Sequence, residues 1–162
     1  MSKIVQCVPN FSEGRDSKKI EAIVSVLKNK EGFNLVSYEP DGDYNRTVVT
    51  LLGDPLKIIN ALVEFTGKVL ELVDMNVQSG EHPRMGAVDV IPFIPIQDVT
   101  MEECVVYANT VAKKINVEYN IPIFMYAEAA NVKNRVKLPT IRKGEFEGMK
   151  EKIKLPEWAP DY

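Results

Sequence analysis

The chain has 162 residues, of which 45% are hydrophobic and 27% charged, and its formal net charge is −3. This composition is typical of a globular domain and excludes a disordered or collagen-like chain. The acidic balance and the lack of a basic run argue against a nucleic-acid partner. The first residues lack the apolar stretch of a signal peptide and no apolar run approaches ~18 residues, so we expect a cytoplasmic protein with no membrane partner.

The two cysteines predict free thiols. Cys7 and Cys104 lie far apart in the sequence, and neither has the close second ligand that a metal site needs. Cys7 falls in an apolar strand and Cys104 in a helix, where a thiol packs as a small apolar group.

The first part of the chain predicts a strand, a helix and a hairpin. The apolar run over residues 4–9 predicts the strand. Asp16 can cap the helix, whose end is marked by Gly32. Residues 34–38 and 47–52 are rich in Val and Leu and predict two strands joined by a sizeable polar loop.

The second part predicts two long helices and two further strands. Asp54 precedes a proline and begins a helix with a long apolar face. The run over residues 88–96 contains two prolines, so its strand should be short or lie at a sheet edge. Thr100 opens a third helix with a capping box, and residues 121–126 predict another strand. Short helices are predicted over residues 129–134 and 145–153.

This order of elements predicts the fold class. It is typical of an α/β (α+β) domain in which a mixed β-sheet carries helices packed on one face, in a split-βαβ-like order with additions. Residues 1–162 form a single domain in this interpretation. The opposite face of the sheet must then be covered by something else.

His82 is the only histidine, and it lies in a polar, restricted loop between glycines and next to a proline. Because its ordinary pKa is close to neutral, such a histidine can transfer protons in either direction. A surface histidine in a turn is the plainer alternative, since catalysis also needs an orienting partner.

Two further polar segments are candidates for binding. Asp41 and Asp43 flank a glycine as in a calcium loop, but the later ligands of that motif are missing, so we expect no metal. Arg46 could bind a carboxylate or be a solvated charge at a strand end. Residues 10–14 could offer N–H groups to an anion or serve as a structural cap.

Several stretches resemble the glutamate formimidoyltransferase family, specifically its N-terminal subdomain. The most specific is GEHPRMGAVDVIPFIP over residues 80–95, together with CVPNFSEG over residues 7–14 and NRTV over residues 45–48. AEAA over residues 127–130 and PEWAPD over residues 156–161 resemble family segments in the same order. The resemblance therefore spans essentially the whole chain.

The resemblance implies transfer of a formimino group between N-formimino-L-glutamate and tetrahydrofolate, with tetrahydrofolate as co-substrate. It implies that His82 is the catalytic histidine and that an acidic residue between the second and third strands lies near it. Glu39 occupies that position where we expect Asp, with Asp41 and Asp43 close by. Within or beside the matched motifs, the candidate substrate-binding residues are Asn10, Asp41, Asn45, Arg46, Arg84 and Gly86, the two arginines being chosen for their charge.

The family normally continues into a C-terminal subdomain, which is absent from this sequence. An uncovered apolar sheet face drives association, so the resemblance favours a homo-oligomer or a complex with a separate C-terminal subdomain. A non-catalytic folate-binding or interaction module, and formyl instead of formimino transfer, stay open as alternatives.

Overall fold

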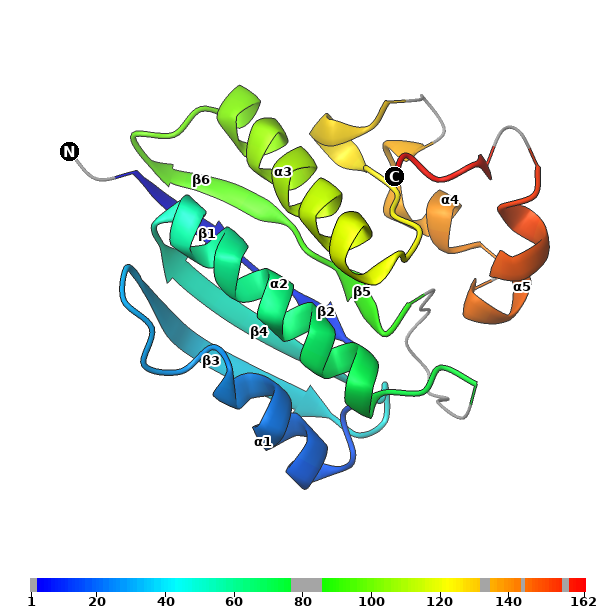
Figure 1. The fold of residues 1–162 in the computed structure, drawn as a ribbon, viewed down its shortest axis with the longest axis horizontal. Helices are drawn as coiled ribbons and strands as arrows, with labels where there is room; N and C mark the ends of the chain where they lie inside the picture. The colour runs from blue at the N-terminus through cyan, green and yellow to red at the C-terminus, as the bar shows by residue number, and fades with distance from the viewer. Residues whose placement is uncertain (1–2, 77–85, 132–134, 144, 156–157) are drawn as a thin grey trace.

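The computed structural model describes residues 3–76, 86–131, 135–143, 145–155 and 158–162. Within them, six strands form one sheet and the helices α1 to α5 accompany it, which confirms the predicted α/β class (Figure 1). The described part contains no helix that is both long enough and apolar enough to cross a bilayer.

The sheet is built around β4. Strands β1 and β2 follow one another along one side of β4, β3 lies on its other side, and β6 and β5 lie beyond β1 and β2. The bounds of the strands are β1 Ile4–Cys7, β2 Asn10–Phe11, β3 Phe33–Asp41, β4 Arg46–Gly53, β5 Val88–Val90 and β6 Phe93–Gln97.

The split-βαβ order is confirmed, with one difference in strand direction. All pairings between the described strands are antiparallel, whereas a mixed sheet was expected. The reason is that each helical crossover skips a strand: α1 joins β2 to β3 across β4, and α2 joins β4 to the β5 and β6 segments across β1 and β2. Strands of the same direction therefore never become neighbours.

Side-chain chemistry at the helix starts explains three of the helices. Asp16 caps α1, Asp54 caps α2, and Thr100 with Glu103 forms the capping box of α3, all as predicted. Their bounds are α1 Ser17–Ser25, α2 Pro55–Leu72 and α3 Met101–Tyr119. Helix α1 ends well before Gly32, which instead takes a φ of 96° in the turn before β3.

Helices α1, α2 and α3 lie side by side over one face of the sheet (Figure 1). Burial alternates along β4, and its fully buried residues Val49 and Leu51 point to the helices. Phe11 of β2 packs edge-on against Phe65 of α2, with ring centroids 5.8 Å apart. No described helix covers the opposite face, on which Ile94 is 39% exposed; we call this surface the open face.

The C-terminal part differs most from the prediction. Residues 121–126 do not form a strand of the sheet; instead the Ile123 carbonyl accepts a hydrogen bond from the Asp161 N–H at 2.8 Å, so the segment is held by the chain terminus. Pro122 has no N–H to offer a strand partner. The terminal elements are a 3-10 helix at Ala127–Ala129, α4 at Leu138–Arg142 and α5 at Glu145–Lys152.

The short helices, the proline-containing strands and the cysteines agree with the sequence predictions in most respects. Helix α5 confirms the helix expected from residue 145, while α4 was not predicted. The helix expected over residues 129–134 is replaced by the earlier 3-10 helix, and residues 132–134 lie outside the described residues. The run 88–96 divides into two short edge strands, as its prolines predicted. Cys7 and Cys104 are both buried and free, also as predicted.

Candidate functional site

Three of the motifs noted in the sequence meet in the structure. Residues 10–14 lie between the β3–β4 hairpin and Gly86, the first described residue after the segment that contains His82. The contacts on both sides are hydrogen bonds between residues that are 31 to 74 positions apart in the chain. The convergence makes this region the candidate functional site.

The contact with the hairpin depends on Gly14 and Asn45. The side-chain oxygen of Asn45 accepts a hydrogen bond from the Gly14 N–H at 2.8 Å. A side chain at residue 14 would collide with the Asp41 carbonyl oxygen and approach the backbone N and O of Arg46 to 2.6 Å. Thr47 adds a hydroxyl donated to the Glu13 carbonyl at 2.6 Å. Backbone packs directly on backbone here, which requires glycine.

Ser12 makes the contact with Gly86. Its hydroxyl donates to the Gly86 carbonyl at 2.7 Å, and its N–H donates to the Ala87 carbonyl at 2.8 Å. The Gly86 N–H in turn donates to the Asp89 carboxylate at 3.3 Å. The backbone that leaves the histidine-containing segment is thus fixed to the same short segment that holds the hairpin.

Strand register places several predicted site residues on the open face. Asn10 and Glu39 both pair with Val48, one from each side of β4, so the three residues form a row across three strands. Neighbouring strands lie about 4.8 Å apart, which separates the backbones of Asn10 and Glu39 by about 10 Å. Asp41 pairs with Arg46 in the next row on this face. Phe11 and Thr47 point to the other side and are fully buried.

The predicted residues differ in their immediate contacts. Glu39 is exposed to solvent. The Asp41 carboxylate accepts the N–H groups of Asp43 and Tyr44 at 3.0 and 3.1 Å and so shapes the hairpin turn. The Arg46 guanidinium lies 5.1 Å from the centre of the Tyr44 ring, and its buried Nε has no hydrogen-bond partner among the described residues.

Asn45 has a clear structural role in this arrangement. It is 1% exposed and has a φ of 54°, a left-handed conformation that asparagine tolerates better than most residues. Its hydrogen bond to the Gly14 N–H holds the motif that contains Asn45 and Arg46 against the motif that contains Gly14. A contact of Asn45 with substrate stays a prediction.

His82 and Arg84 lie outside the described residues. Within the described residues, no group of three or more His, Cys, Asp and Glu side chains is arranged to hold a metal ion.

Sequence reasoning did not single out Ser12, Asp89 or Arg142. Asp89 and Arg142 form an ion pair whose side chains are only 4% and 15% exposed, and the pair joins the middle of β5 to α4. A charged residue inside an apolar strand run is the signal that could have drawn attention to Asp89. Its partner is 53 residues away in the chain and carries no local signal.

On its open face, the site presents two carboxylates, a guanidinium and an amide. Such a set can bind a substrate that has both carboxylate and amine-like groups, because each substrate group finds a hydrogen-bond partner of opposite character. The exposed Glu39 carboxylate is also available to orient a histidine or to accept a proton.

The chain is similar to known proteins over its whole length. The family described as formiminotransferase domain, N-terminal subdomain, matches residues 4–162. The glutamate formimidoyltransferase of Streptococcus pyogenes serotype M1 is 47% identical over 162 residues, which is 100% of this chain and 54% of that protein. The glutamate formimidoyltransferase of Thermoplasma acidophilum is 41% identical over 98% of this chain and 53% of that protein.

A longer relative shows the same relationship. The formimidoyltransferase-cyclodeaminase of Dictyostelium discoideum is 46% identical over the whole of this chain, which covers 30% of that protein. The chain thus spans about half the length of the glutamate formimidoyltransferases it matches. From the full-length match and the convergence of the three motifs, the chain belongs to the formiminotransferase family and corresponds to its N-terminal subdomain.

Proposed function

We propose that this chain takes part in the transfer of a formimino group between N-formimino-L-glutamate and tetrahydrofolate. The observation that carries the proposal is the 47% sequence identity to a glutamate formimidoyltransferase, over an alignment that covers 100% of this chain. The meeting of the matched motifs at Ser12 and Gly14 supports it, since residues that are distant in the sequence gather at one place.

The proposed role of His82 follows from the chemistry of the reaction. An amine of tetrahydrofolate attacks the formimino carbon, and the bond from that carbon to the glutamate nitrogen breaks. The attacking nitrogen loses a proton and the departing nitrogen gains one. A histidine with a pKa near neutrality can accept the first proton and return it to the leaving group, which is general base followed by general acid catalysis.

We assign the role of orienting His82 to Glu39, with Asp41 and Asp43 as the neighbouring alternatives. A carboxylate beside the imidazole fixes its tautomer and stabilises the charged form. Glu39 is favoured over Asp41 because it is exposed on the open face while the Asp41 carboxylate is engaged in the hairpin turn, and over Asp43 because Asp43 lies in that turn and not on a strand of this face. Arg46 and Arg84 are proposed to bind substrate carboxylates.

The open face is the proposed contact with a second subdomain. On this face, Ile94 and Ile96 of β6 are 39% and 53% exposed, and Leu52 of β4 lies in the same layer. Apolar side chains in a row on a sheet are typical of a surface that packs against a partner. The relatives contain about as much chain again, which could supply that partner and complete the substrate site.

The test is an assay of formimino transfer with the 162-residue chain alone and with the remaining half of the Streptococcus pyogenes enzyme added as a separate protein. We expect activity only in the mixture, and its loss in His82→Ala with partial return on addition of imidazole. Activity of His82→Ala equal to that of the unchanged chain would remove the histidine from the mechanism.

The role of Glu39 is tested in the same mixture. Glu39→Gln should lower kcat and shift the pH profile of kcat, because the histidine loses its charged neighbour. Glu31→Gln is the matched control, since Glu31 is also exposed but lies in the turn before β3. Transfer of a formyl group in place of formimino, or tetrahydrofolate binding with no turnover in any mixture, would replace the proposal by one of the alternatives.

A further inference from the structure

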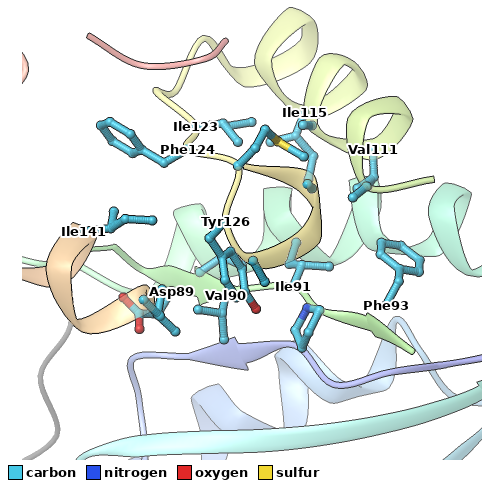
Figure 2. Close-up of a pocket in the computed structure, with 18 of the residues that line it drawn as sticks. Asp89, Val90, Ile91, Phe93, Val111, Ile115, Ile123, Phe124, Tyr126 and Ile141 are labelled. Carbon is cyan, nitrogen blue, oxygen red and sulfur yellow. The ribbon is translucent and has the colours of Figure 1, made fainter. Parts of the chain in front are cut away.

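A cavity lies on the far side of β5 and β6 from the β3–β4 hairpin. Its volume is about 300 Å³. Figure 2 shows its walls: Val111 and Ile115 of α3, Phe93 of β6, and Ile123 and Phe124 of the segment that follows α3. Ile141 of α4 closes one side. Of the site residues that the sequence predicted and the structure describes, only Gly86 also lines it.

Polar groups gather at one end of this cavity. Tyr126 extends from the segment after α3 toward Val90 and Ile91, as Figure 2 shows, and Asp89 lies at the same end. Among the described residues, no hydrogen bond engages the Tyr126 hydroxyl. Arg142, which pairs with Asp89, has a buried Nε that bonds to no group in the described part of the chain.

These groups indicate the chemistry of a ligand. Asp89 is paired with Arg142, and Glu128, the other charged residue that lines the cavity, is exposed to solvent, so a charged ligand would lose its hydration without gaining a buried counter-ion among the described residues. Tyr126 lines the cavity and its hydroxyl can donate a hydrogen bond, so a ligand acceptor placed opposite it gains a partner. An apolar cavity of about 150 Å³ binds benzene, so one of twice that volume has room for two fused rings.

We propose that this cavity is a binding site for a neutral, mainly apolar small molecule of about two rings with one hydrogen-bond acceptor, which the Tyr126 hydroxyl binds. The site is separate from the open face, and the proposal does not depend on formimino transfer. The burial of Tyr126, which raises its pKa to about 12, keeps the hydroxyl protonated as a donor at neutral pH.

The probe is 1-indanone, a neutral two-ring ketone, and indane is the matched probe without the acceptor. Methyl resonances of methionine report the location of binding, because Met101, Met125 and Met149 line the cavity whereas the buried Met75 does not. We expect 1-indanone at low-millimolar concentration to shift the first three resonances and to leave that of Met75 unchanged. No shift of the three, or an equal shift of Met75, overturns the proposal.

Two variants test the walls of the cavity. Ala108→Phe fills it from α3 and should abolish the shifts, whereas Val106→Phe places the same aromatic side chain on the exposed side of the helix and should leave them intact. If a folded Ala108→Phe chain binds 1-indanone as well as the unchanged chain does, the ligand does not bind in this cavity. If Ala108→Phe does not fold, the methionine shifts and the variant below decide the question.

Tyr126→Phe tests the polar contact. Removing one hydrogen bond should weaken 1-indanone about three- to tenfold. The affinity for indane should change less than about twofold, since indane offers no acceptor. Equal affinities of 1-indanone and indane, or equal losses of both in Tyr126→Phe, refute the assigned role of the hydroxyl.

Discussion

Asn45 and Gly14 are joined by a hydrogen bond of 2.8 Å from the Gly14 N–H to the Asn45 side chain, 31 residues along the chain. The bond connects the turn of the β3–β4 hairpin to the segment that leaves β2. Through Ser12, the same segment binds Gly86. Together with the Thr47–Glu13 bond, this pair helps to fix how the hairpin, which contains Glu39, Asp41 and Arg46, sits relative to the end of the histidine-containing segment.

Asn45→Ala should be strongly destabilising, and Asn29→Ala is its matched control. The two asparagines have φ values of 54° and 56°, so alanine pays the same left-handed strain at both positions. Asn45 is buried and binds Gly14, whereas Asn29 is exposed. Leaving the Gly14 N–H unsatisfied should make Asn45→Ala about 1–3 kcal/mol more destabilising than Asn29→Ala in urea unfolding. If both variants lose the same free energy of unfolding, the backbone strain at the left-handed position explains the whole effect and the bond to Gly14 contributes nothing.

Gly14→Ala should destabilise the chain by about 1–3 kcal/mol, because the new methyl group meets backbone atoms of Asp41 and Arg46 that cannot move independently. Gly148→Ala in α5 is the control: apart from the backbone of the helix itself, no atom of the described residues lies within 4 Å of its added methyl group. There the loss of backbone freedom in the unfolded chain should give a gain of about 0.5–1 kcal/mol. Urea unfolding measures both, and a Gly14→Ala chain as stable as the unchanged one would contradict the close packing.

The elements with strong local signals were predictable from the sequence. Helices α1, α2 and α3 have Asp16, Asp54 and Thr100 as N-caps. In each case a side-chain oxygen just before a helical pattern of apolar residues accepts backbone N–H groups of the first turn. The run that contains Pro92 and Pro95 lies at the sheet edge because proline has no backbone N–H to donate to a neighbouring strand.

Long-range contacts decided what the sequence could not predict. Residues 121–126 have the apolar character of a strand, but they form hydrogen bonds with the C-terminal residues and not with a described strand. The Asp161 carboxylate accepts the Met125 N–H and forms an ion pair with Arg135. The Asp89–Arg142 pair and the Ser12–Gly86 bond join residues whose separation gives no periodic signal. In the candidate site, the motifs indicated the residues, while only the strand register showed that Asn10 and Glu39 flank the same valine.

Breaking the Asp89–Arg142 pair from one side should cost about 3–5 kcal/mol, because Asp89→Ala leaves an uncompensated charge in the interior. The double variant Asp89→Leu with Arg142→Met should recover most of this loss. Glu71→Ala breaks the exposed pair with Lys68 and should change stability by less than about 1 kcal/mol. A double-mutant cycle by urea unfolding measures the coupling; additive losses in the Asp89–Arg142 cycle would mean that the two charges do not interact.

Tyr126 should make stability depend on pH in the alkaline range. Burial raises its pKa from 10.0 to about 12, so between these values the folded chain keeps a proton that the unfolded chain releases. The folded state then binds more protons, and the free energy of unfolding must fall as pH rises through this window. The full contribution, about 2–3 kcal/mol, is present below about pH 10 and lost above about pH 12.

Tyr126→Phe isolates this effect. The free energy of unfolding of the variant should fall less steeply than that of the unchanged chain between about pH 10 and pH 12, because phenylalanine has no proton to release. Absorbance of tyrosinate, taken as the difference between the two proteins, should show one group that titrates near pH 12. A difference titration centred near pH 10 would show that the Tyr126 hydroxyl is fully hydrated, and would contradict the partly desolvated donor that the proposed ligand contact in the cavity uses.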